Sequence, residues 1–328
     1  MREPGKEWRL KHIAIMKAGD VQYITGLLTS YDSGSIPEYA LTTSAIMSAK
    51  SEAIREALAR DSSGIIAFED SNPLGFLVTE KLAYDTEFFG VSCWNIAHLA
   101  ASEATGMGEI TREALIHEFL KKNESPFFVS CRTRSNDISG INSLENTGFR
   151  LIDVVVKYFF DLGTQELPRH SFDCTIRDYH ESDLEKLKDI AGTFTETRFH
   201  YDPNFRLQAP QFWRQHIENA SKGMADKILV AELDGKAVGF LTLKIESDLN
   251  RKIGLKLGRM VFAAIDPTVR GRGLYTSLIW AGLNYFAPRC NLVESAFAHA
   301  NNVAVQRAWQ RLGFKPAGTY VTFHLWRK

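Results

Sequence analysis

The sequence predicts an α/β protein with a mixed sheet, in which two copies of one fold follow each other along the chain. Strand-like and helix-like apolar segments alternate through all 328 residues. The order β-α-α-β-β-β-α-β-α-β occurs twice, and a Gly-Phe pair precedes the last strand of each half, at Gly148-Phe149 and Gly313-Phe314. Such self-similarity indicates an internal repeat, and the length suits two domains. Two unrelated α/β domains are the alternative.

The first half is expected to begin with a strand and two helices. Asp20 precedes an apolar run, VQYITGLL, and an aspartate in this place is typical of a helix N-cap. Asp70-Ser71-Asn72-Pro73 has the composition of a turn, so the segments around it are expected to pair as a hairpin. The expected elements are a strand at 10–17, helices at 20–30 and 43–60, strands at 65–68, 74–82 and 93–100, a helix at 110–122, a strand at 127–132, a helix at 138–146 and a strand at 151–161.

A change of composition separates the halves. Residues 162–171 contain glycine and proline but no apolar run, which is typical of a connection between folded parts. We therefore predict a linker at 164–171 between a first domain at 1–163 and a second at 172–328.

The second half repeats the order of the first. Asp234-Gly235 between two apolar runs is typical of a hairpin turn, and Ser182-Asp183 is expected to open a helix. The expected elements are a strand at 175–177, helices at 184–192 and 211–220, strands at 228–233, 237–245 and 261–265, a helix at 274–287, a strand at 292–298, a helix at 302–312 and a last strand at 320–326.

Residues 261–287, VFAAIDPTVRGRGLYTSLIWAGLNYFA, have the features of a phosphate-binding strand, turn and helix. Asp266-Pro267 ends the apolar strand, because proline has no N–H to give to a neighbouring strand. Arg270-Gly271-Arg272-Gly273 follows, and then apolar residues recur at helical spacing. Glycines let the backbone approach an anion closely, and the first N–H groups of a helix have no partner within it. A solvated basic turn is the alternative.

Two segments resemble the signatures of the GNAT superfamily of acyl-CoA-dependent N-acyltransferases. Residues 270–275 resemble its R-x-x-G-x-G/A turn, with Tyr275 at the last small position. Residues 302–314 resemble its second signature, N-x-x-A-x-x-x-Y-x-x-x-G-F, with Trp309 at the tyrosine position. The resemblance implies two tandem GNAT-like domains and acetyl-CoA as the co-substrate. The residues that it implies for acetyl-CoA binding are Ala263, Ala264, Ile265, Arg270, Gly271, Arg272, Gly273, Leu274, Tyr275, Asn302 and Trp309.

The first copy lacks these features at the corresponding place. Residues 102–109, SEATGMGE, contain glycines but no arginine. Glu103 and Glu109 would repel a pyrophosphate. The first domain is therefore expected to be a degenerate copy that serves structure or acceptor binding.

Further segments resemble dTDP-fucosamine acetyltransferases, which acetylate the 4-amino group of a nucleotide-linked amino sugar. These segments are YDTEFFG at 84–90, NTGFRL at 146–151, TRFHYDP at 197–203 and FWRQHIENA at 212–220, and the likeness covers most of residues 74–328. Asp202 could pair with an ammonium and Arg198 with a phosphate, although Asp202-Pro203-Asn204 is also an ordinary turn. The candidate acceptor-binding residues are Arg198, His200, Tyr201, Asp202 and His324.

The implied reaction is attack of a neutral amine on the acetyl thioester, with a backbone N–H at the end of the strand before the basic turn as the oxyanion partner. Trp309 cannot release a proton, so it is expected to donate a hydrogen bond to sulfur or to pack against the cofactor. Tyr275 and Tyr320 are then the candidates for a general acid. His299 is the candidate base, with a structural histidine as the alternative. Asn302 is expected both to cap the next helix and to hold coenzyme A or a water molecule.

Composition excludes several other classes. The net charge is +0, with 39 basic and 39 acidic residues, whereas a nucleic-acid binder carries a basic excess. The four cysteines have no metal-ligand spacing and fit reduced thiols, so we expect no metal and a cytoplasmic location. The N-terminus has no long apolar core typical of a signal peptide or membrane span, so no membrane partner is expected.

These observations predict an N-acetyltransferase that acts on a small-molecule amine, with a nucleotide-linked amino sugar as the first candidate. A small amine, an amino acid or a peptide N-terminus is the second candidate. A non-catalytic sensor that binds acyl-CoA is the third, because the usual tyrosine is replaced by Trp309. The oligomeric state is left open, and a homodimer is compatible with the sequence.

Overall fold

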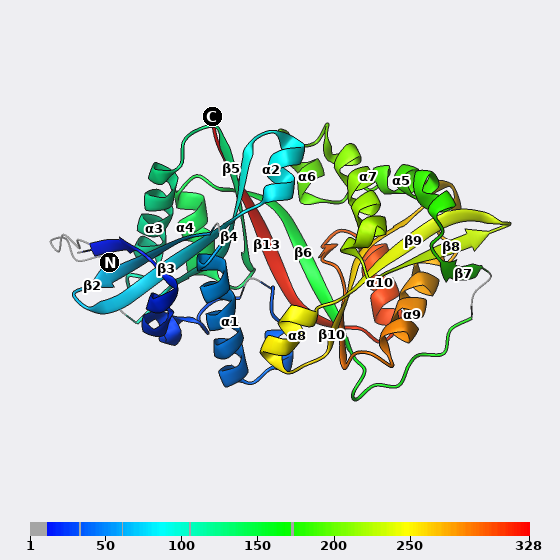
Figure 1. Cartoon of the computed structure of the whole chain (residues 1–328), viewed down its shortest axis with the longest axis horizontal. Coiled ribbons are helices and arrows are strands. Elements are labelled where there is room, and N and C mark those ends of the chain that lie inside the picture. Colours follow the sequence, from blue (N-terminus) through cyan, green and yellow to red (C-terminus); the bar gives the residue numbers. More distant parts are fainter. Residues whose placement is uncertain (1–11, 33, 61, 105, 172–173) are drawn as a thin grey trace. The chain divides into compact units, whose positions relative to one another are not determined.

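The computed structural model describes residues 12–32, 34–60, 62–104, 106–171 and 174–328. The chain divides into two compact units. The first unit holds Met1–Leu151 and Val321–Lys328, and the second holds Ile152–Tyr320. Each unit combines a mixed sheet with helices, as Figure 1 shows, so the predicted α/β class with a mixed sheet is confirmed.

The first unit has the strand order β1-β2-β3-β4-β5-β13, in which β4 and β5 are parallel and the pairs from β1 to β4 are antiparallel. Apolar residues of η1 and α1 pack on this sheet, among them Ile24 and Ile54 against Phe76. The elements of the first unit are β1 (His12–Ile15), η1 (Ala18–Leu27), η2 (Glu38–Ala40), α1 (Thr43–Leu58), β2 (Ser63–Glu69), β3 (Asn72–Lys81), α2 (Ala83–Phe89), β4 (Ser92–Ala101), α3 (Gly108–Lys122), β5 (Phe127–Arg134), α4 (Ile138–Asn146) and the last part of β13 (Lys315–Arg327).

The second unit has the strand order β13-β6-β11-β10-β9-β8-β7, with β12 paired to β6. Among the described residues, no helix is long and apolar enough to cross a membrane. The elements of the second unit are β6 (Arg150–Asp161), β7 (Thr175–Asp178), η3 (Glu181–Asp183), α5 (Leu184–Gly192), α6 (Arg198–Tyr201), α7 (Ala209–Asn219), η4 (Ala220–Met224), β8 (Lys227–Leu233), β9 (Lys236–Ile245), α8 (Ser247–Ile253), β10 (Leu257–Ile265), η5 (Pro267–Val269), α9 (Leu274–Phe286), β11 (Leu292–Glu294), β12 (Ala298–His299), α10 (Val303–Arg311) and the first part of β13.

Helices cover both faces of the second unit's sheet, because successive side chains of a strand point to opposite faces. Leu241 of β9 packs in one core with Leu278 of α9. Phe240, which precedes Leu241 on the same strand, packs in another core with Ile190 of α5 and Ile217 of α7. Burial of each such side chain stabilises the fold by about 1.5–3 kcal/mol. The sheet between these two layers is therefore a rigid support for the loops at its ends.

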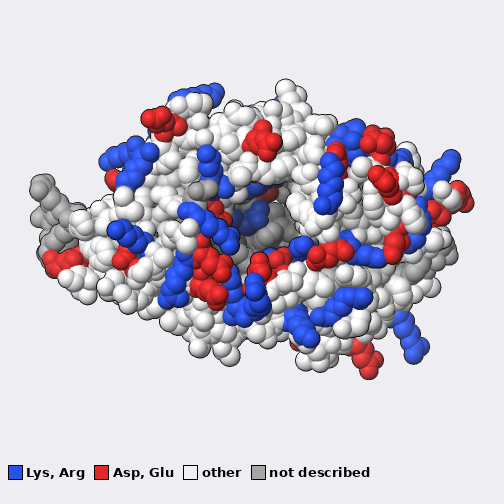
Figure 2. Space-filling view, in the orientation of Figure 1, with Lys and Arg blue, Asp and Glu red and all other residues white. Residues whose placement is uncertain are grey.

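Basic and acidic side chains are interspersed over the surface of each unit. Figure 2 shows this on one face, and it agrees with the net charge of +0. A surface without a field of one sign does not steer a strongly charged macromolecule. Binding selectivity has to come from local groups instead.

Two element predictions are wrong in detail. Asp20 is not the N-cap of an α-helix: it lies inside the 3₁₀ helix η1, and its carboxylate accepts the N–H of Lys17 at 2.7 Å. The predicted strand at 292–298 is broken into β11 and β12. Ser295 causes the break, since its Oγ accepts the N–H of Tyr158 at 2.9 Å and donates to the carbonyl of Ala296 at 2.7 Å.

The sequence prediction also missed a short helix in each unit, α2 and α8. Each follows the second strand of a hairpin and ends at a glycine in the left-handed region, Gly90 at φ 68° and Gly254 at φ 65°. Left-handed glycines are the usual residues after a helix. The matching position of the two helices agrees with the predicted repeat of the fold.

The compact units differ from the predicted domains in their last strands. β6 pairs with β11 and β12, so all but its first two residues belong to the second unit. The last eight residues of the chain belong to the first unit. The segment predicted as a linker lies on the second unit, where the carbonyl of Pro168 accepts the indole N–H of Trp280 at 2.7 Å. A boundary at 164–171 stays a prediction about where the repeat restarts.

Candidate active site

The strand β10 is irregular at Val261. The pairing of β10 with β9 shifts register between Met260 and Phe262, so Val261 forms a bulge and is 40% exposed. On its other side, β10 pairs in parallel with β11 only over Leu257–Arg259. The edge of β10 beyond the bulge, where Ala263, Ala264 and Ile265 are predicted to bind acetyl-CoA, is therefore not paired with β11. Backbone groups at such an edge are available to a ligand.

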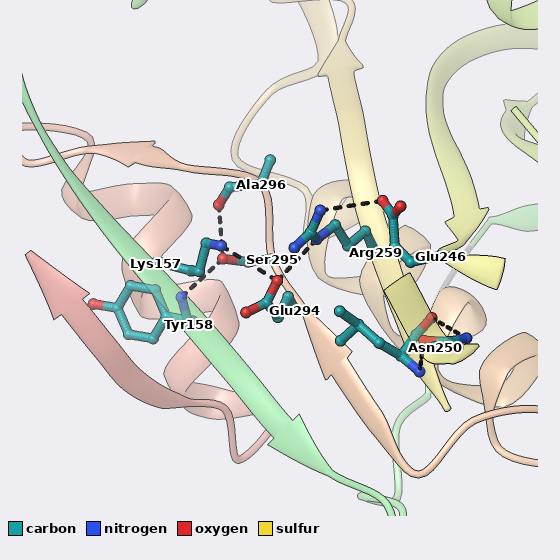
Figure 3. A network of polar contacts seen from close by, with 9 residues as sticks. Lys157, Tyr158, Glu246, Asn250, Arg259, Glu294, Ser295 and Ala296 are labelled. Carbon is teal, nitrogen blue, oxygen red and sulfur yellow. Dashed lines mark hydrogen bonds and ion pairs between the residues drawn. The ribbon is translucent and has the colours of Figure 1, made fainter. Parts of the chain in front are cut away.

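A buried ion-pair network lies where this pairing ends (Figure 3). Glu294 of β11 is fully buried, and its Oε2 is 3.2 Å from Nζ of Lys157 on β6 and 2.9 Å from Nε of Arg259 on β10. Arg259 also pairs with Glu246 at 3.3 Å. Removal of one partner from such a buried ion pair strongly destabilises the fold, because it leaves a buried charge uncompensated. The network therefore ties three strands together beside the unpaired edge. Sequence reasoning missed it, although charged residues inside apolar strands were a visible signal.

The basic turn follows β10 and has the geometry of an anion-binding turn. Gly271 and Gly273 adopt φ of 82° and 79°, and no atom lies within 4 Å of where a Cβ would stand at either glycine. α9 begins at Leu274 without a side-chain cap, so its first N–H groups are available. The side chain of Arg270 donates to the carbonyl of Ile265 at 3.3 Å, and Arg272 is exposed. The ligand of this turn stays a prediction.

The start of the turn is held by Asp266. Its carboxylate pairs with Lys186 of α5 at 2.6 Å and accepts the N–H of Thr268 at 3.0 Å. The hydrogen bond from Lys186, followed by those from Thr268, lowers the pKa of Asp266 to about 2. Asp266 is thus ionised at neutral pH and anchors the turn to α5.

Trp309 and Tyr275, both predicted beside the thioester, are neighbours in the structure. Their ring centroids are 6.0 Å apart in an edge-to-face arrangement, and Trp309 is 1% exposed. The Nε1 of Trp309 is buried and has no partner at hydrogen-bond geometry among the described residues, although its N–H is close enough to the Tyr275 hydroxyl to lower the pKa of that hydroxyl. Burial has the larger effect and raises the pKa of Tyr275, so its hydroxyl stays protonated. Both groups are therefore hydrogen-bond donors.

Asn302 has the predicted capping role. Its Oδ1 accepts the N–H of Val305 at 3.1 Å at the start of α10. The side chain of Gln306 donates to the carbonyls of His299 and Ala300 at 3.2 and 2.7 Å. The loop between β12 and α10 is thereby held rigid.

The hydrogen bonding of His299 is local. Its Nδ1 accepts the N–H of Asn301 at 3.2 Å. The ring lies 4.9 Å from the ring of Tyr201. A catalytic role for His299 stays a prediction.

The short helix α6 carries Tyr201 and is anchored by aromatic contacts. Phe199 lies 4.6 Å from Phe212 and 6.4 Å from Trp213 between ring centroids. Trp213 in turn lies 4.9 Å from Phe262, the residue after the bulge of β10. These contacts place α6 next to the face of β10 that follows the bulge.

The other predicted acceptor residues differ in their surroundings. Asp202 is 1% exposed, and its Oδ1 accepts the N–H of Asn204 at 2.9 Å, as in the ordinary turn named as the alternative. The guanidinium of Arg198 lies 4.7 Å over the ring of Phe199. His200 contacts Thr197 through Nδ1 at 2.9 Å. His324 lies in the part of β13 that belongs to the first unit, where its ring packs 4.7 Å from Phe128, and its role stays a prediction.

Buried polar atoms without a hydrogen-bond partner mark the site independently, because such atoms are rare in folded proteins. Among the described residues of the second unit they are Oδ1 of Asp153, Oε2 of Glu196, Nε2 of His200, Nε1 of Trp213 and Nε1 of Trp309. Sequence reasoning missed Asp153 and Glu196. An aspartate inside the apolar run LIDVVV was the signal that could have found Asp153.

The corresponding strands of the first unit diverge in the same way. The register of β3 and β4 shifts at Ala97, and the pairing of β4 with β5 ends at Ile96 and Cys131. Beyond that point Tyr31 and Asp32 line a cavity of about 10 Å³, which holds at most one water molecule. Side chains of both strands and of the segment at Tyr31 and Asp32 line this space.

The turn that corresponds to the basic turn carries an internal anion. The carboxylate of Glu103 pairs with the buried Arg112 at 2.5 Å and contacts Gly108 at the start of α3. A helix N-terminus attracts an anion, and here a side chain supplies it. That the first domain is a degenerate copy serving structure or acceptor binding stays a prediction.

Comparison with known proteins shows which family part of the second unit is similar to. Residues 187–314 match the family model described as Acetyltransferase (GNAT) family. The chain is 21% identical over 274 residues to the spore coat polysaccharide biosynthesis protein SpsD of Bacillus subtilis (strain 168), which covers 79% of this chain and 86% of that protein. It is 33% identical over 87 residues to mycothiol acetyltransferase of Mycobacterium avium (strain 104). The matched segment covers 24% of this chain and 26% of that protein.

Solved structures share the fold over nearly the whole chain. A GCN5-related N-acetyltransferase from Sphaerobacter thermophilus has a TM-score of 0.60 at 15% identity and covers 96% of this chain and 95% of its own. A tandem GNAT protein from the clavulanic acid biosynthesis pathway has a TM-score of 0.53 at 13% identity and covers 96% and 98%. These likenesses confirm the predicted tandem GNAT-like fold. None of the relatives named here is a dTDP-fucosamine acetyltransferase, so that resemblance stays a prediction.

Proposed function

Since the chain is an N-acetyltransferase of the GNAT family, we propose that it transfers the acetyl group of acetyl-CoA to the amino group of a nucleotide-linked amino sugar. The observation that carries the proposal is the unpaired edge of β10 between the bulge at Val261 and the basic turn. This edge offers backbone groups to the pantetheine arm, and the turn offers N–H groups and arginines to the pyrophosphate.

Several side chains support the chemistry at the thioester. The buried Nε1–H of Trp309 lacks a partner and can donate a hydrogen bond to the sulfur or the carbonyl oxygen. The protonated hydroxyl of Tyr275 lies beside it. The amine nitrogen forms the new bond to the acetyl carbon while the C–S bond breaks and coenzyme A leaves as a thiolate. An ammonium loses two protons when it becomes an amide, and one of them neutralises this thiolate. The corresponding thiol has a pKa of about 8.5, so the thiolate is an adequate leaving group without a strong acid.

The nature of the acceptor rests on two lines of support. Segments at 84–90, 146–151, 197–203 and 212–220 resemble acetyltransferases of a nucleotide-linked amino sugar. The relative from Bacillus subtilis has a name that refers to polysaccharide biosynthesis. A sugar amine in the reducing cytoplasm, the compartment that we propose, is consistent with both.

Calorimetric titration with acetyl-CoA tests the cofactor site. We expect one site per chain, and Gly273→Glu should lower the affinity at least tenfold, because it places a carboxylate and a strained backbone in the turn. Gly235→Glu is the matched control, since Gly235 also has a positive φ, 72°, and open space around it, but lies in the hairpin between β8 and β9. That variant should bind acetyl-CoA as the unmodified chain does.

Release of coenzyme A in the presence of amines then tests the acceptor. We expect turnover with dTDP-4-amino-4,6-dideoxygalactose. Turnover with peptides or amino acids alone would overturn the sugar acceptor. Binding of acetyl-CoA with no turnover on any amine would favour a sensor. Two sites per chain would mean that the first unit is also active.

A further inference from the structure

One buried carboxylate oxygen on β6 has no hydrogen-bond donor among the described residues, and no role has been assigned to it. Asp153 is 5% exposed, and its Oδ1 accepts no hydrogen bond from that part of the chain. A buried acceptor of this kind is destabilising unless a ligand or a water molecule satisfies it. Asp153 therefore has the property expected of a residue that binds a hydrogen-bond donor.

The pairing of β6 with β12 places this carboxylate beside the acceptor side of the site. Val155 of β6 is directly opposite His299 of β12, and the N–H of Ala300 donates to the carbonyl of Val154 at 2.8 Å. Residues two apart on a strand share a face, so Asp153, Val155 and His299 point to the same side. The ring of Tyr201 covers His299 at 4.9 Å.

A second carboxylate, that of Glu196, interacts electrostatically with the hydroxyl of Tyr201. Burial raises the pKa of Tyr201, and the charges of Glu196 and Asp153 raise it further, so both carboxylates lie within Coulombic range of the hydroxyl. Oε2 of Glu196 is also buried without a partner. Tyr201 itself is 42% exposed, so a ligand can reach this group from solvent. Oδ1 of Asp153 and Oε2 of Glu196 are both acceptors without a donor among the described residues. A ligand that donates hydrogen bonds and carries a positive charge would match these two carboxylates.

We propose that Asp153, assisted by Glu196, binds the acceptor's amine as an ammonium and accepts its first proton. The inference rests on the proposed N-acetyltransfer and names a proton acceptor other than the candidate base His299, whose Nδ1 already accepts the N–H of Asn301. One N–H bond of the ammonium breaks and its proton goes to the carboxylate. The freed lone pair then attacks the acetyl carbon, the C–S bond breaks, and the second proton goes to the departing thiolate.

Asp153→Asn tests the assignment, because it keeps the shape of the side chain and removes its charge. We expect the kcat/KM for dTDP-4-amino-4,6-dideoxygalactose to fall about ten- to a hundredfold, as for the loss of one charge-assisted hydrogen bond. The affinity for acetyl-CoA should not change. Asp161→Asn is the matched control on the same strand, since Asp161 contacts only the turn at Gly163 and Thr164 through its side chain and should keep full activity.

A pair of ligands separates charge recognition from a structural effect. In calorimetric titrations with coenzyme A present, the unmodified chain should bind dTDP-4-amino-4,6-dideoxygalactose more tightly than dTDP-6-deoxygalactose, which lacks the amine. Asp153→Asn should bind the two equally. If Asp153→Asn keeps this preference and its kcat/KM, the assignment is overturned while the proposed function stands. If the unmodified chain neither binds nor acetylates the amino sugar, the proposed function fails with it.

Discussion

The residue at position 309 determines which proton transfers are possible at the thioester. Trp309 stands where the GNAT signature has a tyrosine, and its buried N–H has no partner among the described residues. An indole can stabilise charge as a donor but cannot transfer a proton. We therefore expect acetyl transfer on this chain to depend on the thiolate as a leaving group and on the proposed carboxylates at the acceptor side, rather than on an acid at position 309.

A buried histidine makes the stability of the protein depend on pH. His216 of α7 lies among the rings of Trp213 and Phe262 at 5.4 and 5.5 Å, and burial lowers its pKa to about 4. An unfolded histidine has a pKa of about 6.5, so between pH 6.5 and 4 the unfolded chain binds the extra proton. The free energy of unfolding should fall as the pH falls through this window. His216→Gln should reduce the slope by up to about 1.4 kcal/mol per pH unit.

Urea denaturation at a series of pH values measures this slope. His117→Gln is the control, because His117 is exposed on α3 and its replacement should leave the slope unchanged. Equal slopes for His216→Gln and the unmodified chain would contradict the prediction.

At the level of elements, the site depends on where strand pairing stops. The bulge at Val261 and the end of the β10–β11 ladder free one edge of β10, and the network around Glu294 holds the strands at that point. Removal of one partner from a buried ion pair leaves uncompensated charge. The network therefore stabilises both the fold and the geometry of the edge.

Glu294→Gln tests the importance of this network. We expect the free energy of unfolding to fall by about 3–5 kcal/mol, because Lys157 and Arg259 lose their shared buried anion. The KM for acetyl-CoA should rise as well. Denaturant unfolding measures the first effect, and Glu218→Gln provides the control. Glu218 forms partly exposed pairs with Lys222 and Lys188, so its loss should cost less than about 1 kcal/mol. Equal losses in the two variants would argue against a role for the network.

The sequence predicted most elements because apolar periodicity and turn residues are local signals. The helix of α4 and the basic turn before α9 are examples. It did not predict the break at Ser295, because that break depends on a hydrogen bond to Tyr158, 137 positions away. Asp153 was missed for the same reason: only the pairing of β6 with β12 brings it near His299. Contacts between distant segments determine such sites, and a single sequence does not encode them visibly.

In both units two parallel strands stop pairing beyond a register shift: β4 and β5 in the first unit, and β10 and β11 in the second. In the first unit Glu103 supplies an anion at the start of α3, and Tyr31 and Asp32 fill the space beyond the bulge. In the second unit two glycines leave the turn open. A duplicated fold thus retains its architecture in both copies, and we expect the chemistry to be confined to the second.

The residues that belong to each unit predict which fragments of the chain fold by themselves. The second unit is one continuous stretch, Ile152–Tyr320, whereas the first needs Val321–Lys328 in addition to its own stretch. We expect a fragment of residues 152–320 to unfold cooperatively on heating, as followed by circular dichroism. A fragment of residues 1–151 should do so only when residues 321–328 are joined to it by a short glycine-serine linker. Equally cooperative unfolding with and without these residues would contradict this assignment.

The same division sets an order of events during synthesis on the ribosome. All residues of the second unit have been made before the last eight are added, so this unit can close while the chain is still attached. The first unit, although most of it is made first, is complete only after Val321–Lys328 have been added. The copy that carries the proposed chemistry is thus complete before the copy that precedes it, and a premature stop near the C-terminus would damage the earlier half of the protein more than the later one.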